Sequence, residues 1–367
     1  MQVLMLLSDG FGGFGGIAKF NRDFLRALSL SPLVASAHAW PRVIPGPIEE
    51  LLPEAVVYRR AFQGGKLRYC GHALRDLLLG PACDLVICGH INLLPVAWLV
   101  ARLRRAALAL VVHGIEAWAP TRSPLVNVLA RRIDKLLAVS AVTAERFIMW
   151  AGVGDACCTI LPNSVDATAF TPGPKPQALL ARYKLHDRRV IMTMGRMAPK
   201  ERYKGFDEVI EAMPQLLAAF PDLTYLIAGE GSDRPRLAEK ARRLGVAERV
   251  VFTGRVTEGE KADHYRLADV FVMPSTGEGF GIVFLEAAAC GLPVIGSAAD
   301  GSREALAGGR FGALVEPASQ SALIDAVSTA LREKCVADRA ELVDRFGVAA
   351  FNRRVGDWLK TSEATVR

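Results

Sequence analysis

The sequence predicts an α/β protein built from two doubly wound domains. Two series of short apolar runs alternate with longer amphipathic segments, a pattern typical of parallel sheets covered by helices on both faces. A proline-rich stretch separates the two series, and a chain of 367 residues exceeds what one hydrophobic core usually supports. Ligands of such sheets bind beyond the carboxyl ends of the strands, so functional residues are expected there.

The first series begins at the N-terminus. Its expected strands are 2–7, 33–39, 55–59, 84–88, 107–112 and 135–139. Helical patterns lie between them, as at 16–29, where five apolar side chains share one face: Ile17, Phe20, Phe24, Leu25 and Leu28.

The alternation breaks at "LPNSVDATAFTPGPKPQ" (161–177), which predicts a linker. A second series of expected strands follows, at 189–194, 223–228, 249–253, 269–273, 292–296 and 312–315. Helical patterns fill 205–219, 233–244, 258–267, 281–290 and 318–333. The expected organisation is a first domain at 1–165, a linker at 166–178, a second domain at 179–346 and a helical tail at 347–367.

Composition excludes several classes of protein. The chain is 51% hydrophobic and 23% charged, which is ordinary for a soluble globular protein. The best candidate for a membrane span, 93–112, carries Arg102, Arg104 and Arg105 in its middle. The seven cysteines show no C-x-x-C and no zinc spacing, and no signal peptide is recognisable, so we expect free thiols in the cytoplasm.

The net charge of +7 is concentrated in the first half of the chain. Residues 1–162 hold 17 Lys and Arg against 11 Asp and Glu, whereas residues 163–367 hold 28 against 27. This indicates either a solvated basic surface or a half that faces an anionic partner, such as a phosphorylated acceptor or the phospholipid surface at the inner face of the membrane. The stretch "AWLVARLRR" (97–105) is the local candidate, because Trp98, Leu99 and Arg102 are spaced to share a helix face. We expect no nucleic-acid partner, since the arginines are spread out without interleaved aromatic side chains.

A glycine loop, "SDGFGGFGGIAKF" (8–20), follows the first expected strand. Gly10, Gly12 and Gly15 satisfy the G-x-G-x-x-G pattern of dinucleotide-binding proteins. That pattern also needs an acidic residue about 20 positions on for the ribose, and none occurs from the next expected strand until Glu49. We therefore expect the loop to approach a different ligand.

The stretch "PSTGEGFGIVFLEAAACGLPVIGS" (274–297) carries most of the expected chemistry. A glycine loop ends near Gly281, where a helix begins whose free amides suit a phosphate or sugar oxygen. Glu278 lies in this loop, and Glu286 lies about two turns into the helix among apolar neighbours. Glu286 could be an ordinary helix residue, but a carboxylate in a buried stretch needs partners, and sugar hydroxyls can supply them.

Two further candidates follow expected strands. The loop "GRMAPKERYKGF" (195–206) offers Arg196 and Lys204 to a diphosphate, although it could also be a solvated basic loop. His113, in "VVHGIEAW" (111–118), comes directly after a strand of the first domain and is either a structural or a functional histidine.

The spacing of Glu278 and Glu286, with seven residues between them, resembles the E-x7-E signature of retaining glycosyltransferases of GT-B fold, family 4 (glycosyltransferases group 1). The resemblance covers nearly the whole chain. Its other motifs are the N-terminal glycine loop, "VHG" (112–114), "VSAVTAERF" (139–147), "LPNSVDATAF" (161–170), "GR" (195–196), "YKG" (203–205), "AGEG" (228–231) and "EAAACGLPVIGS" (286–297).

This resemblance implies two Rossmann-like domains that face each other across a cleft, with a C-terminal helix packing back toward the first. The first domain would bind the acceptor and the second a GDP- or UDP-linked sugar. Donor-binding positions are implied at Gly15, Gly16, Arg196, Lys204, Glu278, Gly279, Phe280, Gly281, Ile282 and Glu286.

The resemblance also implies roles for individual residues. Glu286 would hold the ribose, Glu278 the transferred sugar, and Arg196 and Lys204 the diphosphate, with His113 beside the sugar. The spacing from Arg196 to Lys204 exceeds that of the family, so Lys200 is a rival for the phosphate.

The expected activity is hexose transfer, with mannose as the proposed sugar, to a glycan or lipid-linked acceptor in bacterial polysaccharide or glycolipid assembly. A nucleotide-sugar epimerase or a non-catalytic relative are the alternatives. No cofactor or metal is expected, since no D-x-D sequence stands at the donor loop.

Overall fold

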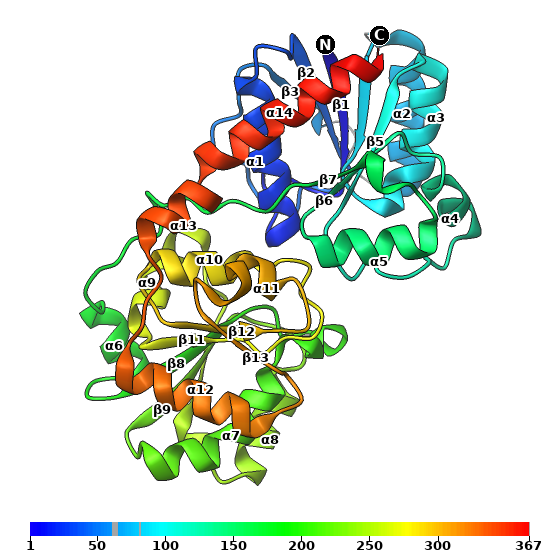
Figure 1. Cartoon of the computed structure of the whole chain (residues 1–367). Coiled ribbons are helices and arrows are strands. Elements are labelled where there is room, and N and C mark those ends of the chain that lie inside the picture. The colour runs from blue at the N-terminus through cyan, green and yellow to red at the C-terminus, as the bar shows by residue number, and fades with distance from the viewer. Residues whose placement is uncertain (61–64, 81, 367) are drawn as a thin grey trace. The chain divides into compact units, whose positions relative to one another are not determined.

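A computed structural model of the chain describes residues 1–60, 65–80 and 82–366. The chain forms two compact units (Figure 1). Unit 1 comprises Met1–Ser164 and the residues from Val348 onward, and unit 2 comprises Val165–Gly347. The segment 166–178 belongs to unit 2, and its last two residues already form the start of a helix.

Unit 1 contains a seven-stranded, wholly parallel sheet in the order β3-β2-β1-β4-β5-β6-β7. The strands are β1 (Gln2–Leu7), β2 (Ser36–Pro41), β3 (Val56–Tyr58), β4 (Leu85–Cys88), β5 (Ala107–Val112), β6 (Lys135–Ala138) and β7 (Cys158–Ile160). The order reverses between β1 and β4, which places a topological switch point at the carboxyl ends of these two strands.

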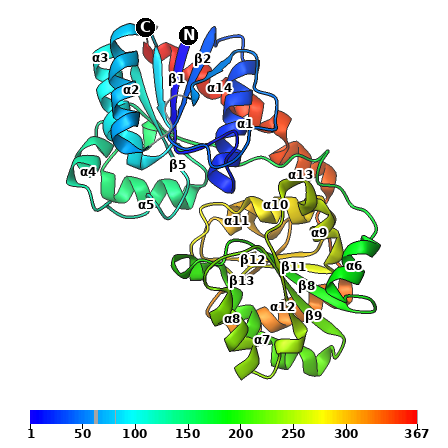
Figure 2. The ribbon, with the colours of Figure 1, turned by 180° about the vertical axis from the view of Figure 1, so that it is seen from behind.

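Helices cover both faces of this sheet (Figures 1 and 2). One face carries α1 (Gly16–Leu30) and α14 (Val348–Val366). The other carries α2 (Lys66–Leu79), α3 (Leu94–Arg104), α4 (Pro124–Ala130) and α5 (Ala141–Ala151), with short turns η2 (Ile91–Leu93) and η3 (Asp155–Cys157). The expected return of the C-terminal helix to the first domain is confirmed, because α14 packs on α1 through Phe351 against Phe20 and Trp358 against Phe24.

Unit 2 contains a six-stranded parallel sheet in the order β10-β9-β8-β11-β12-β13. Its strands are β8 (Arg189–Met194), β9 (Leu223–Ala228), β10 (Val250–Gly254), β11 (Val270–Val272), β12 (Val294–Ser297) and β13 (Ala313–Val315). Here the order reverses between β8 and β11.

The sheet of unit 2 lies between two helical layers (Figure 1). One layer contains α7 (Phe206–Ala219), α8 (Arg234–Arg243) and α12 (Gln320–Glu333). The other contains α9 (Lys261–Leu267), α10 (Ile282–Ala289), α11 (Ser302–Ala305) and α13 (Arg339–Phe346). The remaining short elements are α6 (Gln177–Tyr183), η4 (Pro199–Lys204), η5 (Ala247–Arg249), η6 (Glu258–Glu260) and η7 (Ala307–Gly309).

The expected strands all form, with ends shifted by at most three residues. Residues 33–35, which the sequence pattern predicts in a strand, precede β2. The short strand β7 is not predicted by that pattern. The helix expected at 258–267 begins as the turn η6, whose capping box pairs Thr257 with Glu260, and continues as α9. None of the helices formed by the described residues is long and apolar enough to cross a bilayer.

Candidate active site

The carboxyl ends of β8 and β11 meet at the switch point of unit 2 and carry two packed loops. The first loop, 195–205, contains η4, and the second, 273–281, leads into α10. The Thr276 N–H donates to the carbonyl oxygen of Tyr203 at 2.8 Å, which ties the loops together. The predicted donor residues of the second domain therefore lie where ligands of such sheets bind.

An ion pair joins the two loops. The Lys204 ammonium donates to Glu278 Oε1 at 2.6 Å, and both side chains are largely buried. Burial lowers the pKa of Lys204, but the charge and hydrogen bond of Glu278, together with nearby Tyr203 and Glu201, outweigh burial and raise that pKa to about 12. Lys200, the rival lysine, is exposed in the first turn of η4. The structure thus brings Lys204, and not Lys200, to Glu278.

Arg196 lies just after β8, but its side chain does not join the pair formed by Lys204 and Glu278. Its side chain is 73% exposed and donates to Glu201 in the same loop. The hydrogen bond that Arg196 donates to Glu201 raises the pKa of its guanidinium. A diphosphate contact from Arg196 would therefore have to compete with Glu201.

The buried side chain of Phe280 anchors the glycine loop before α10 in the core of unit 2. This ring is buried and packs edge-on against Phe346 at 5.7 Å, so its side chain does not face a ligand. Gly281 caps α10, and Ile282 is its first residue. A donor contact at Phe280 would have to come from its backbone amide. The amide of Ile282 belongs to the first turn of α10, which leaves it without an intrahelical partner. Gly279 lies between Glu278 and this anchor.

Glu286 is 1% exposed on α10, which confirms the expected burial. Its Oε2 accepts a hydrogen bond from the Tyr265 hydroxyl at 2.8 Å, and its Oε1 lies 3.4 Å from the Lys261 ammonium. Burial lowers the pKa of Lys261, but its contacts with Glu286 and Glu258 together outweigh burial and raise that pKa. The buried carboxylate thus already has two protein partners, and a ribose hydroxyl would share it with them.

Asp300, which the sequence analysis missed, supports the second loop from the end of β12. Its carboxylate accepts hydrogen bonds from the Glu278 N–H and the Ser275 hydroxyl, both at 2.8 Å. Burial raises the pKa of Asp300 above its ordinary value, although the hydrogen bonds from Ser302, Glu278 and Ser275 offset part of that rise. At the adjacent Gly301 a Cβ would stand 2.1 Å from the carbonyl oxygen of Gly279, so only glycine fits there. The signal was the sequence "DGS" (300–302), which begins four residues after the last residue of the strand expected at 292–296.

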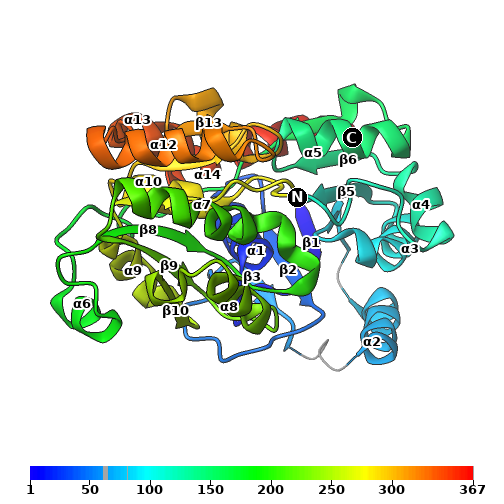
Figure 3. The ribbon, with the colours of Figure 1, turned by 90° about the horizontal axis from the view of Figure 1, so that it is seen from below.

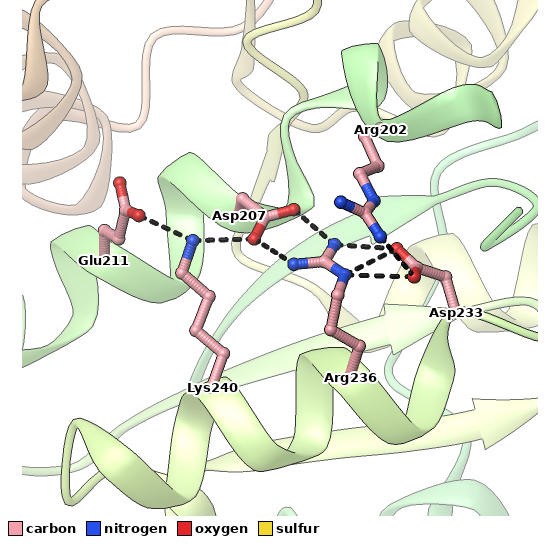
Figure 4. A network of polar contacts seen from close by, with 6 residues as sticks. All are labelled: Arg202, Asp207, Glu211, Asp233, Arg236 and Lys240. Atoms are coloured by element: carbon pink, nitrogen blue, oxygen red, sulfur yellow. Dashed lines mark hydrogen bonds and ion pairs between the residues drawn. The ribbon is translucent and has the colours of Figure 1, made fainter. Parts of the chain in front are cut away.

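A network of charges lies behind the first loop (Figure 4). Arg236 of α8 donates to both carboxylate oxygens of Asp207 at 2.7 and 2.6 Å and to Asp233 at 2.6 Å. Asp233 also lies 3.4 Å from Arg202 of η4, and its N–H donates to the carbonyl oxygen of Met197 at 3.0 Å. The network ends in the contacts of Lys240 with Asp207 and Glu211. It fixes the segment that carries Arg196 and Lys204.

Unit 1 holds the other predicted residues. Gly15, with φ of 87°, caps α1 in a conformation that favours glycine, and no described atom lies within 4 Å of where its Cβ would stand. Gly16 is the first residue of α1. Arg22 of the same helix holds the loop by donating to the carbonyl oxygens of Gly10 and Gly13 at 3.3 and 3.0 Å.

His113 follows β5 and is held in one orientation. Its Nε2 lies 3.0 Å from the carbonyl oxygen of Gly89, so Nε2–H is the donor, and its ring packs edge-on against Phe20. Burial lowers the pKa of His113 to about 4. The ring is therefore neutral near pH 7 and can bind by hydrogen bonds but not by charge.

Comparison with known proteins identifies the family. Residues 188–333 match the profile described as glycosyl transferases group 1. The chain is also 33% identical over 333 residues to a GDP-mannose-dependent alpha-(1-6)-phosphatidylinositol monomannoside mannosyltransferase of Mycolicibacterium smegmatis, covering 86% of this chain and 80% of the relative. The chain belongs to the group 1 glycosyltransferases.

Solved structures show the GT-B fold of this glycosyltransferase. HepE from Anabaena, in complex with UDP and glucose, matches 98% of this chain and 100% of its own at 22% identity, with a TM-score of 0.78. Sucrose-phosphate synthase from Thermosynechococcus elongatus matches 100% of both chains at 20% identity, with a TM-score of 0.80. The two Rossmann-like sheets of this chain agree with the expected fold class.

The glycosyltransferase uses a nucleotide sugar, and its candidate residues divide between the units. Unit 2 brings Lys204 to Glu278 and places the start of α10 beside them, whereas Arg196 pairs with Glu201 and Glu286 with Tyr265 and Lys261. Gly15, Gly16 and His113 belong to unit 1. Among residues 1–60, 65–80 and 82–366 there is no cluster of three His, Cys, Asp or Glu side chains that could hold a metal ion.

Proposed function

We propose that this glycosyltransferase transfers mannose from GDP-mannose to a lipid-linked glycan acceptor, with retention of the anomeric configuration. The observation that carries the proposal is the 33% identity, over 86% of the chain, to a relative named as GDP-mannose-dependent. That relative's name also supports a phosphatidylinositol-linked acceptor. We place the reaction in the cytoplasm at the inner face of the membrane, as part of glycolipid or polysaccharide assembly.

In the proposed reaction the bond between the anomeric carbon of mannose and the β-phosphate oxygen breaks. A bond to the acceptor hydroxyl oxygen forms, and the hydroxyl proton passes to the departing phosphate of GDP. Arg196, Lys204 and the amides of Gly279, Gly281 and Ile282 are suited to stabilise the charge that develops on the diphosphate. Gly15 and Gly16 would let the backbone of unit 1 approach the same group.

The two glutamates and the histidine have positioning roles in this proposal. Glu278 would accept hydrogen bonds from the sugar hydroxyls, and its pairing with Lys204 supports positioning over nucleophilic attack. Glu286 would accept from the ribose hydroxyls. His113, neutral at pH 7, would hydrogen-bond the sugar through Nδ1, because its Nε2–H already donates to Gly89.

We also propose that the reaction needs no metal ion. Two cations and a helix N-terminus can balance the leaving charge without one. Transfer assayed after EDTA treatment should keep its rate. Complete loss of transfer, restored by magnesium or manganese, would overturn this part of the proposal.

The decisive experiment compares donors with and without an acceptor. The purified protein is given radiolabelled GDP-mannose or UDP-glucose, with phosphatidylinositol monomannoside in detergent micelles, and Glu278→Gln serves as the inactive control. We expect label in the lipid fraction from GDP-mannose, in an α-linkage by NMR. Transfer from UDP-glucose alone would exclude mannose. Conversion of the donor without acceptor would indicate an epimerase, and donor binding without turnover would indicate a non-catalytic relative.

A further inference from the structure

The helices α2 and α3 pack side by side on one face of the sheet of unit 1 (Figure 3). The side of α2 that faces away from the sheet exposes two leucines. Leu67 is 91% exposed and Leu74 is 57% exposed, and seven residues place them on the same helix face. Tyr69 and Ala73, on the opposite face, are buried in the core. Leucines of an amphipathic helix usually face the core, whereas Leu67 and Leu74 of α2 face solvent.

The outer side of α3 repeats this arrangement. Leu99 is 46% exposed and Leu103 is 60% exposed, one turn apart, while Leu94, Ala97 and Val100 are buried. Four large aliphatic side chains therefore face outward on two neighbouring helices.

Arginines surround these leucines. The two helices and the cap residue of α3 contain five arginines and one acidic residue, Asp76. Arg68, Arg75, Arg102 and Arg105 are exposed. The carboxylate of Asp76 lies 3.7 Å from the guanidinium of Arg59, a residue that belongs to neither helix. The exposed leucines and arginines form what we call the α2–α3 face, defined as Leu67, Arg68, Leu74, Arg75, Leu99, Arg102 and Leu103.

Arg104 has a different role from its neighbours, which corrects the grouping made from the sequence. Its Nη2 donates to the carbonyl oxygens of Asp76 and Gly80 at 2.7 and 2.9 Å. These carbonyls belong to the C-terminal end of α2, so Arg104 fastens the two helices together. A test of the surface must leave Arg104 in place.

An open groove of about 670 Å³ continues the basic surface beyond the end of α3. Trp98, Arg102, Arg105 and Arg132 line it. The Arg102 guanidinium lies 6.0 Å from the centre of the Trp98 ring. Asp134, which also lines the groove, accepts a hydrogen bond from the Leu108 N–H at 2.8 Å.

We propose that the α2–α3 face binds the surface of an anionic phospholipid bilayer, with its leucines in the interface and its arginines on the lipid phosphates. Helices that lie in a membrane interface combine such an apolar side with flanking basic residues. The proposal deepens the proposed function and rests on it in one respect, because a lipid-linked acceptor would be presented at that surface.

Charge and spacing favour a bilayer over the other occupants. The four leucines are divided between two helices and are flanked by arginines, and a fluid surface can accept each of them separately. A protein partner would need a contiguous, shape-matched apolar patch. The excess of exposed arginines complements anionic headgroups, whose attraction is screened by salt.

The test is co-sedimentation of the full-length protein with vesicles of phosphatidylcholine alone or with phosphatidylglycerol, at low and high salt. One variant removes the leucines (Leu67→Gln/Leu74→Gln/Leu99→Gln/Leu103→Gln), and another reverses charges (Arg68→Glu/Arg75→Glu/Arg102→Glu). The matched control, Leu30→Gln/Met149→Gln, changes exposed apolar residues of α1 and α5. Circular dichroism confirms that each variant is folded.

We expect wild type and control to bind anionic vesicles at low salt, and each face variant to lose about tenfold or more in partition coefficient. Equal binding by the face variants, or no preference of the wild type for anionic vesicles, would overturn the proposal. Mannose transfer in detergent micelles is measured in parallel. Transfer without vesicle binding refutes the membrane surface alone, and vesicle binding without transfer refutes the proposed activity alone.

Discussion

The ammonium of Lys204 lies 2.6 Å from the carboxylate of Glu278, although 73 residues separate them in sequence. The pair joins the loop after β8 to the loop after β11 at the switch point of unit 2. The 3₁₀ turn η4 takes up the extra residues between Arg196 and Lys204, so the longer spacing still brings Lys204 to the strand ends.

Replacing Lys204 by alanine should weaken binding of GDP. Because a hydrogen bond from a charged group is worth about 1.5–3 kcal/mol, we expect the dissociation constant to rise roughly 10- to 150-fold. Isothermal titration calorimetry measures this, with Lys200→Ala as the matched control. A larger effect of Lys200→Ala would assign the phosphate to the rival lysine.

Arg196 should act on the diphosphate and not on the nucleoside. Arg196→Ala is expected to weaken GDP binding while leaving guanosine binding unchanged, and to slow turnover more than it weakens binding. Glu201→Gln removes the negative charge that pairs with Arg196, so it should tighten GDP binding. Equal losses of guanosine and GDP affinity in Arg196→Ala would contradict a phosphate role.

Glu286→Gln should raise the dissociation constant for GDP by roughly 5- to 150-fold, because ribose hydroxyls lose a charged acceptor worth about 1–3 kcal/mol. Tyr265→Phe is the control, since it removes a protein hydrogen bond to the same carboxylate but leaves the carboxylate in place. If both variants bind GDP as the wild type does, Glu286 serves only to pair Lys261 and Tyr265 inside unit 2.

The depressed pKa of His113 predicts a specific acid sensitivity. Its pKa is about 4 in the folded chain against an ordinary value of 6.5, so folding favours the neutral ring. The stabilisation is complete above pH 6.5 and is lost as the pH falls toward 4, where the unfolded chain alone binds the proton. Between pH 7 and 4.5 the thermal midpoint of the wild type should therefore fall further than that of His113→Asn. Parallel curves would show that the ring gains no proton on unfolding.

The alternation of apolar runs was sufficient to predict both sheets, because buried parallel strands are marked by short, strongly apolar segments. It failed at β7, because the residues Cys158–Ile160 are half-buried or exposed and form no strongly apolar run. It also placed β2 three residues early, since Leu33 and Val34 are apolar but lie in a turn.

The sequence was sufficient to predict several residues of the candidate site, but not the side chains with which they pair. Glu278 and Glu286 were recognisable from their spacing, whereas the pairing of Glu286 with Tyr265 and Lys261 depends on how α9 packs on α10. Asp300 could not be ranked, because only the fold shows that its carboxylate holds the Glu278 amide. Packing also separated Arg104 from Arg102 and Arg105, which look alike in the sequence.

The contacts of Arg236 predict how the loop 195–205 is held. Arg236→Ala leaves Asp207 and Asp233 without their shared partner, and Asp233 in turn supports Met197 and Arg202. We expect a loss of about 1–3 kcal/mol in unfolding free energy and a higher KM for GDP-mannose with a smaller change in kcat.

Arg242→Ala is the matched control for Arg236→Ala, because Arg242 lies on the same helix and pairs only with the exposed Glu239 among the described residues. Its loss should cost little, as exposed ion pairs contribute about 1 kcal/mol or less. Urea unfolding and donor kinetics of the two variants decide the matter. If Arg236→Ala has the same unfolding free energy as the control and keeps the wild-type KM, the network does not position the loop. Lys204 is then held by its pairing with Glu278 alone.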